Sequence, residues 1–185
     1  MSEPQGTSIG EAYLLEARSR LRYYRWLTER ALEQVDDHAF FASLDDESNP
    51  IAVVVKHLAG NMLSRFSDFG RSDGEKPDRD RDAEFELYVD DTRVRLEMKL
   101  NQGWDLVEST VDGLTPDALT NTVFVRGQPL SVLEAVNRQL THYAYHVGQI
   151  VYVARAACGP RWESLSIPRG HSASFNAKLG RGHAG

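Results

Sequence analysis

Two histidines spaced four residues apart are the strongest candidates for chemistry in this sequence. They lie in the segment Q-L-T-H-Y-A-Y-H-V-G-Q-I-V, which spans residues 139–151 and contains no proline. If the segment is helical, His142 and His146 project from one face of the helix and can reach a common ion. A zinc-like ion takes about three or four protein ligands, so the pair predicts a third ligand elsewhere in the chain.

His57 is the preferred third ligand. Among the four remaining histidines, it alone lies on another long segment of apolar periodicity, near the buried edge, where packed helices could bring it to the pair. His38 lies in an acidic loop and His183 in the tail. His171, which follows a turn in P-R-G-H-S, is the reserve candidate for a ligand or a substrate contact.

Each of these histidines could instead be a surface residue, or a core residue satisfied by hydrogen bonds. The segment around the pair carries little charge, and burying two imidazoles there without partners would cost on the order of 1–3 kcal/mol for each unsatisfied group. A metal ion would satisfy both rings. The surroundings therefore favour a three-histidine site formed by His57, His142 and His146.

Length, composition and charge indicate one globular domain over residues 1–185. The chain is 41% hydrophobic, enough for one well-buried core. Its net charge of -6 comes from interspersed acidic and basic residues without a basic stripe, so nucleic acid is not an expected partner. No stretch approaches the roughly 20 apolar residues needed to span a membrane. The single cysteine, Cys158, excludes an internal disulfide, and a cytoplasmic location is predicted.

Four amphipathic segments predict an all-α fold, a four-helix bundle. They run from Ile9 to about Val35, from Pro50 to about Phe69, from Asp90 or Asp91 to Val111, and from a cap at Ser131 to about Cys158. Helix-capping signals mark the starts: Thr7 or Ser8, Asn49 before Pro50, and Ser131 with Glu134. The run T-N-T-V-F-V-R-G-Q-P-L predicts a small hairpin before the last long helix. The order of the helices in space is left open.

The connecting segments give weaker expectations. Residues 36–49 predict a short helical turn or loop, with Leu44 tucked beneath it, and Val94 is expected on the apolar face of the third helix. Residues 70–82 are rich in charge, without large apolar side chains. They predict a surface loop that buries nothing and that either serves the site or only spans the bundle. The tail is expected to pack over the bundle through four apolar residues, Trp162, Leu165, Ile167 and Phe175. We expect a frayed leader and a flexible end beyond about residue 176.

Several of these segments resemble a known family. The sequences K-H-L-A-G-N-M and T-H-Y-A-Y-H-V-G-Q-I-V-Y, with the order of four helices, resemble the DinB/YfiT-like superfamily of metal-binding bundles. The loop D-G-E-K-P and the tail S-L-S-I-P-R-G-H-S-A-S-F-N are similar to its bacterial DUF1572 subfamily. The resemblance extends from about Ile9 to Phe175.

The resemblance implies a divalent metal, zinc, nickel or iron in different members, held by His57, His142 and His146. It also implies transfer of low-molecular-weight thiols to electrophiles in several relatives, and homodimers in many. The DUF1572 subfamily itself carries no settled reaction. Zinc is the metal expected here, with nickel and iron as alternatives.

Three imidazoles leave at least one coordination position for a ligand, as in catalytic zinc sites. That position could hold a thiol as thiolate or water as hydroxide, and the ligands do not distinguish the two. Cys158 lies twelve residues beyond His146, about 18 Å along a continuous helix, so a thiol would have to be exogenous. The leading hypothesis is a thiol transferase of detoxification type. The alternatives are a metal-dependent hydrolase and a non-enzymatic, stress-related metal-binding dimer.

The other polar residues near the predicted site have no assigned role from sequence. Asn61 could orient a ligand or form a helix-to-helix hydrogen bond. Possible anchors for a carboxylate-bearing thiol are Arg65, Tyr145, Tyr152 and Arg169. Nothing in their spacing selects among them.

Overall fold

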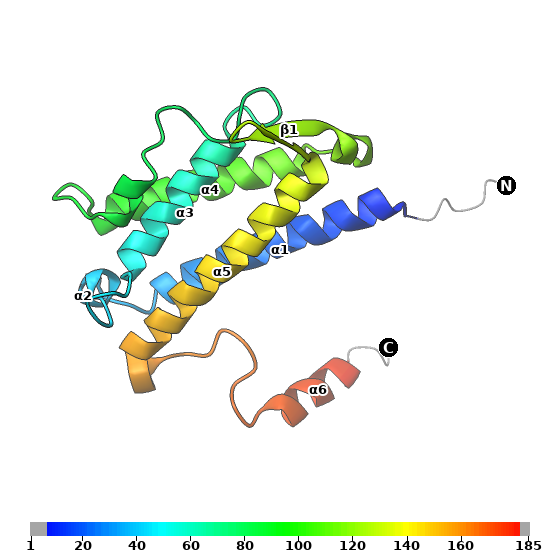
Figure 1. Ribbon diagram of the computed structural model, residues 1–185. Helices are drawn as coiled ribbons and strands as arrows, with labels where there is room; N and C mark the ends of the chain where they lie inside the picture. The colour runs from blue at the N-terminus through cyan, green and yellow to red at the C-terminus, as the bar shows by residue number, and fades with distance from the viewer. Residues whose placement is uncertain (1–6, 182–185) are drawn as a thin grey trace.

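The protein is mostly helical, with one small two-stranded sheet (Figure 1). The computed structural model describes residues 7–181. Its elements are α1 (Ile9–Leu32), α2 (Asp37–Phe41), α3 (Ile51–Phe66), η1 (Asp82–Phe85), α4 (Arg93–Asp112), η2 (Pro116–Thr120), β1 (Thr122–Val125), β2 (Gln128–Ser131), α5 (Val132–Cys158), η3 (Gly159–Arg161) and α6 (Ser172–Arg181). The expected all-α class is confirmed in this broad sense.

The four long helices share one hydrophobic core. α3 packs against α4 and α5, and α1 packs against the same two helices. The segment I-A-V-V-V-K-H-L-A-G-N-M of α3 is apolar almost all round, which suits a helix covered on most sides. The largest fully buried side chains, Trp104 of α4 and Tyr143 of α5, stack edge to face with ring centroids 5.5 Å apart. This packing fixes the faces of α3 and α5 that carry the three histidines.

The predicted N-cap of α1 and the predicted capping box of α5 are present, and α1 also has a capping box. Ser8 and Glu11 close the first turn of α1, and Ser131 and Glu134 do the same for α5. α5 then runs for 27 residues without a break and ends where Gly159 adopts a positive φ of 55°. His142 and His146 therefore share one continuous helix, as the sequence predicted.

The boundaries of α3 and α4 differ from those predicted. Pro50, not Asn49, occupies the N-cap of α3, and the helix ends at Phe66 because the chain turns through a left-handed residue, Asp68 (φ 51°). α4 begins at Arg93, after Thr92 caps it. The expected burial of Val94 is wrong, since its side chain is 79% exposed.

Residues 36–49 form a short helix followed by a loop. The helix, α2, is capped by the side chain of Asp36, and Phe40 is fully buried beneath it. Leu44 is 55% exposed, contrary to expectation. Phe40, together with the partly buried Phe41, attaches this segment to the core.

The predicted hairpin is present. β1 and β2 pair antiparallel, with Thr122 opposite Ser131. The two turn residues, Arg126 and Gly127, have positive φ angles of 55° and 70°, as a two-residue hairpin turn requires. Their N–H groups donate to the carboxylate of Asp73 at 2.8 and 2.7 Å, which attaches the hairpin to the charged loop.

The expectation that residues 70–82 bury nothing is wrong. Gly74 is buried: its N–H donates to the carbonyl of Phe124 at 2.8 Å, and its own carbonyl accepts from the Ser64 hydroxyl at 2.9 Å. The Arg79 side chain is only 6% exposed because two carboxylates pair with it. Ion pairs and backbone hydrogen bonds replace apolar contacts here, so hydropathy does not reveal the burial.

The tail packs on the core only in its first part. Trp162 and Leu165 lie partly buried against the core, whereas Ile167 and Phe175 are exposed. α6, which the sequence did not predict, lies away from the four long helices (Figure 1). The expected frayed leader, up to residue 6, and the last part of the expected flexible end, residues 182–185, lie outside the described residues.

Within residues 7–181, no helix is both long enough and apolar enough to cross a lipid bilayer.

Candidate metal centre

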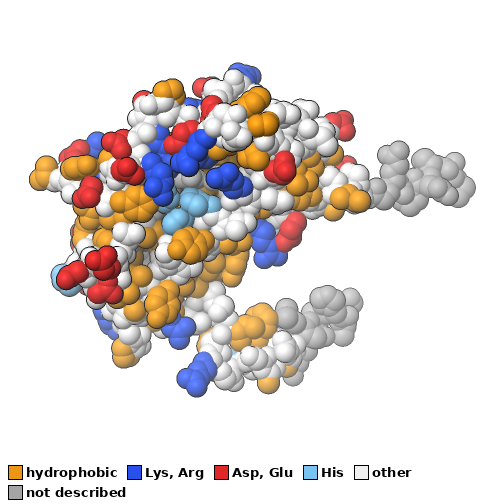
Figure 2. All heavy atoms as spheres, in the orientation of Figure 1, with side chains coloured by type: hydrophobic (Ala, Val, Ile, Leu, Met, Phe, Trp, Pro, Cys, Tyr) orange, Lys and Arg blue, Asp and Glu red, His pale blue; other side chains and the backbone are white. Residues whose placement is uncertain are grey.

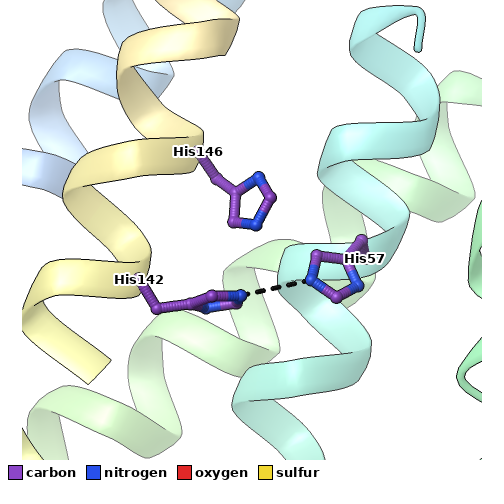
Figure 3. Close-up of side chains that lie close together, drawn as sticks. All are labelled: His57, His142 and His146. Atoms are coloured by element: carbon purple, nitrogen blue, oxygen red, sulfur yellow. Dashed lines mark hydrogen bonds between the residues drawn. The ribbon is translucent and has the colours of Figure 1, made fainter. Parts of the chain in front are cut away.

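The three predicted histidines converge between α3 and α5 (Figure 3). One ring nitrogen from each of His57, His142 and His146 lies within 4.8 Å of those of the other two. The rings point toward one another, from one turn of α3 and two successive turns of α5. The helix pair thus brings together residues that are 85 positions apart in sequence.

The donor set suits a divalent ion such as zinc. The Nε2 atoms of His57 and His142 are 3.2 Å apart. Two ligands about 2.1 Å from a single tetrahedral ion would be separated by about 3.4 Å, so this spacing needs little adjustment. Neutral imidazole is also a ligand that zinc, nickel and iron all accept.

Glu84 fixes the orientation of the His57 ring. Its carboxylate lies 2.8 Å from His57 Nδ1 and accepts the Nδ1 proton, which leaves the lone pair on Nε2, facing the other histidines. Arg79 holds the same carboxylate through two hydrogen bonds of 2.7 and 2.8 Å. Burial opposes ionisation of Glu84, but His57 and Arg79 outweigh it and hold the pKa of this carboxyl below its usual range.

Gln149 orients His146 in the same manner. The Gln149 side-chain oxygen lies 2.7 Å from His146 Nδ1 and can accept its proton, so that Nε2 again carries the lone pair. The Nδ1 atom of His142 is buried without a hydrogen-bond partner among residues 7–181. Two of the three rings are therefore set in orientation by neighbouring side chains.

The site favours neutral imidazoles. Burial first, and then the proximity of His146 and His57, lower the pKa of His142 to about 3. Burial also lowers the pKa of His146, with repulsion from His57 and Arg81 adding to the effect and the hydrogen bond that His146 donates to Gln149 opposing it. At neutral pH His142 and His146 can bind a metal without first losing a proton.

The lowered pKa of His142 predicts acid sensitivity of the metal-free protein. The unfolded chain binds a proton at this residue below about pH 6.5, whereas the folded chain does so only near pH 3. The free energy of unfolding should therefore fall as pH falls from 7 to 5. Denaturant titrations should show a shallower fall for His142→Gln. Equal slopes for the two proteins would contradict the shifted pKa.

Gly60 makes room for the Glu84 carboxylate. A Cβ atom at this position would lie 2.2 Å from Glu84 Oε1 and 2.7 Å from its Cδ. Such contacts are impossible, so any side chain here must displace a carboxylate that His57 and Arg79 hold in place. The lack of a side chain at Gly60 thus allows Glu84 to hold the His57 ring in its orientation.

Gly60→Ala should lower metal affinity by roughly tenfold, the scale of losing a group that orients a ligand. Competition with a chromophoric chelator would measure the change. Gly148→Ala is the matched control, because a Cβ there meets nothing within 4 Å, and it should leave the affinity unchanged. Equal affinities for wild type and Gly60→Ala would show that Glu84 can move without consequence.

A cavity of about 610 Å³ adjoins the histidines. His57 and His142 form part of its wall, together with Asn61, Arg65 and Tyr145, which the sequence singled out. In Figure 2, histidine atoms are visible on this face of the molecule, with Lys and Arg side chains beside them. His57 and His142 are thus accessible to a small molecule that enters the cavity.

Other residues considered from sequence lie elsewhere. Tyr152 is 70% exposed, and Arg169 and His171 are exposed in the tail. His38 borders a different depression, next to α2. Cys158 is buried at the far end of α5, where its thiol donates to the carbonyl of Gln34 at 3.1 Å, so its exclusion from the site holds.

Sequence reasoning missed the residues that support the histidines from the loop. Glu84 and Arg79 lie in a stretch where charged residues alternate without a period, so no pattern separates them from solvated side chains. The usable signal was the length of the loop, which exceeds the usual helix-to-helix connection. Gln149 was detectable, because it lies three residues after His146 on the same helix.

Comparison with known proteins gives a family and no characterised relative. No curated protein matches the chain, and no solved structure does. One family model matches residues 8–171, which include all three histidines, the charged loop and the hairpin. The chain therefore belongs to the family described as protein of unknown function (DUF1572).

Proposed function

We propose that this protein is a metal-dependent enzyme that transfers a low-molecular-weight thiol to an electrophile. Its four long helices would form a bundle of the DinB/YfiT-like type, with His57, His142 and His146 holding a divalent ion. Zinc is the first choice, and nickel or iron are alternatives. The observation that carries the proposal is a cluster of three imidazoles, two of which, His57 and His142, line a cavity large enough for a small substrate.

The donor set favours a catalytic over a purely structural ion. Structural zinc sites are usually closed by four protein ligands, and three is the number typical of catalytic sites. Among residues 7–181, no fourth histidine, cysteine or carboxylate joins the cluster. When bound, the ion would supply Lewis acidity and lower the pKa of a thiol that reaches it.

The residues of the chain would orient the reaction. Glu84 and Gln149 set the tautomers of His57 and His146, which keeps both rings aligned without help from substrate. Asn61 and Tyr145 line the cavity beside the histidines and are placed to contact a bound substrate. Because Cys158 lies at the far end of α5, the thiol must come from outside the protein.

The direct test is thiol consumption by the metal-loaded protein. A panel of thiols and electrophiles would be mixed with the wild-type protein, and loss of free thiol would be measured with a thiol-specific chromogenic reagent. Metal-dependent consumption that disappears in His57→Ala is expected. Absence of consumption across the panel, with His57→Ala equal to wild type, would refute the transferase.

Two other results would redirect the assignment. Turnover of ester or amide substrates without any thiol would indicate a hydrolase. If chelation lowered the melting temperature while no reaction emerged from an unbiased metabolite screen, the ion would serve mainly to stabilise the helices. The homodimer stays a prediction, which sedimentation velocity of the metal-loaded protein would test.

A further inference from the structure

The cavity beside the histidines is strongly cationic. Five arginines contribute to its lining: Arg65, Arg79, Arg81, Arg126 and Arg138. They come from α3, from the charged loop, from the hairpin turn and from α5, segments far apart in sequence. The protein as a whole is acidic, with a net charge of -6, so this concentration of positive charge is local.

Carboxylates of the protein neutralise only part of this charge. Glu75 contacts Arg65 at 2.6 Å, Arg126 at 3.1 Å and Arg79 at 3.6 Å. Glu84 takes up the remaining hydrogen bonds of Arg79. Glu75 and Glu84 thus pair with three of the five arginines. The other two arginines contact neither carboxylate.

Arg81 and Arg138 are those two. The nearest carboxylate to Arg81 is that of Asp82, at 3.8 Å and almost fully exposed, a contact that contributes little. Arg138 lies in α5, and its side chain forms no ion pair or hydrogen bond with any residue in the described part of the chain. Both line the cavity, so both guanidinium groups are available to a ligand there.

Both arginines are also positioned next to the metal ligands. Arg138 precedes His142 by one helical turn and therefore lies on the same face of α5. Arg81 lies over the ring of Phe85, 5.1 Å from its centroid, and that ring in turn packs against His57, with centroids 4.9 Å apart. The two guanidinium groups come from different elements, one from α5 and one from the loop.

The inner wall of the cavity is polar as well. Asn61 and Gln139 line it, each 6% exposed, and the amide oxygen of each has no hydrogen-bond partner among residues 7–181. Unpartnered buried amides are uncommon because they cost free energy. A ligand that reaches the histidines would meet polar groups along its length, which disfavours an apolar substrate.

We propose that this cavity recognises a substrate through an oxyanion group, a carboxylate or a phosphate, which Arg81 and Arg138 bind while the rest of the molecule extends to the histidines. The inference rests on the proposed function and narrows it: the thiol is anionic. Guanidinium groups bind carboxylates and phosphates with paired, charge-assisted hydrogen bonds, and two from different elements would fix the position of the ligand.

A charge series of thiols tests this in the cobalt-loaded protein. The sulfur-to-cobalt charge-transfer band would give dissociation constants for mercaptosuccinate, 2-mercaptoethanol and cysteamine, which are anionic, neutral and cationic. We expect mercaptosuccinate to bind at least about tenfold more tightly than 2-mercaptoethanol, the scale of one charge-assisted contact. In the double variant Arg81→Gln and Arg138→Gln this preference should approach unity, with the affinity for 2-mercaptoethanol unchanged.

The matched control replaces two exposed arginines beyond the site, Arg155→Gln and Arg161→Gln, and so removes the same charge. It should retain the preference. Equal affinities across the thiol series, or a preference that persists in the Arg81 and Arg138 variant, would overturn the inference.

Succinate and inorganic phosphate, titrated by calorimetry into the same protein, separate the two sources of the oxyanion. The anion that binds more tightly identifies the oxyanion group of the substrate as a carboxylate or a phosphate. This arm also separates the two proposals. Cobalt uptake without any thiol band would refute the thiol transferase, yet succinate or phosphate binding that depends on Arg81 and Arg138 would still establish the anion site. Binding of neither anion would refute that site even if neutral thiols bind.

Discussion

Replacing His142 or His146 by alanine should reduce the metal content of the purified protein from about one equivalent per chain to near zero. The two residues lie on successive turns of α5 and contribute two of three ligands, so either change leaves too few donors for a zinc-like ion. His57→Ala removes the third ligand, which lies on α3, and should have the same effect. Elemental analysis of the variants beside the wild type, at equal protein concentration, measures it.

Histidines outside the cluster supply the controls. His38→Ala and His171→Ala remove one imidazole each from exposed positions and should leave metal content unchanged. Circular dichroism would establish that each variant remains helical. Undiminished metal in His142→Ala and His146→Ala would place the metal elsewhere, whatever the result for His57→Ala.

Removal of the Glu84 carboxylate should weaken metal binding by about 10–100-fold, the cost typical of losing a group that orients a ligand. In Glu84→Ala, His57 loses the acceptor at its Nδ1 and Arg79 loses its closest carboxylate. Glu84→Gln should recover part of the affinity, because its amide oxygen can still accept the Nδ1 proton. Chelator competition at neutral pH would give the three dissociation constants.

Loss of a buried ion pair could destabilise the protein without a direct effect on metal binding. A matched variant separates the two effects. Asp91 forms a comparably buried pair with Lys56, at 2.6 Å, but does not contact the histidines. Asp91→Ala should lower the melting temperature of the metal-free protein while metal affinity stays at the wild-type value. If Asp91→Ala and Glu84→Ala lowered metal affinity equally, the role assigned to Glu84 would be wrong.

The long helices could be predicted from sequence because their signals are local. The capping box of Ser131 and Glu134 fixed the start of α5, and the apolar period fixed its buried face. The failures involve interactions between distant segments. Val94 has the right period for burial, but its side chain is 79% exposed, because period alone does not tell which positions a neighbouring helix covers. In α6 the side chains of residues 172–178 are exposed, so no buried stripe marks this helix in the sequence.

The residues of the candidate site also differ in whether local sequence patterns could predict them. His142 and His146 followed from spacing, and His57 from its place at the edge of a buried stripe. Glu84 could not be found, because its partner His57 lies 27 residues earlier and no period links them. Arg138 could not be predicted either. An exposed arginine on a helix is usually a solvated residue, and only the structure places it in the wall of the cavity.

The separation of the ligands along the chain has a consequence for protein levels in the cell. A metal held by both His57 and His142 would act as a cross-link that closes a loop of 85 residues. In the chain-entropy model used for disulfides, a link of that length is worth about 4–5 kcal/mol. With a single cysteine, the chain has no internal disulfide that could do this. Metal starvation would then favour unfolding and proteolysis, so that the abundance of the protein would follow metal supply.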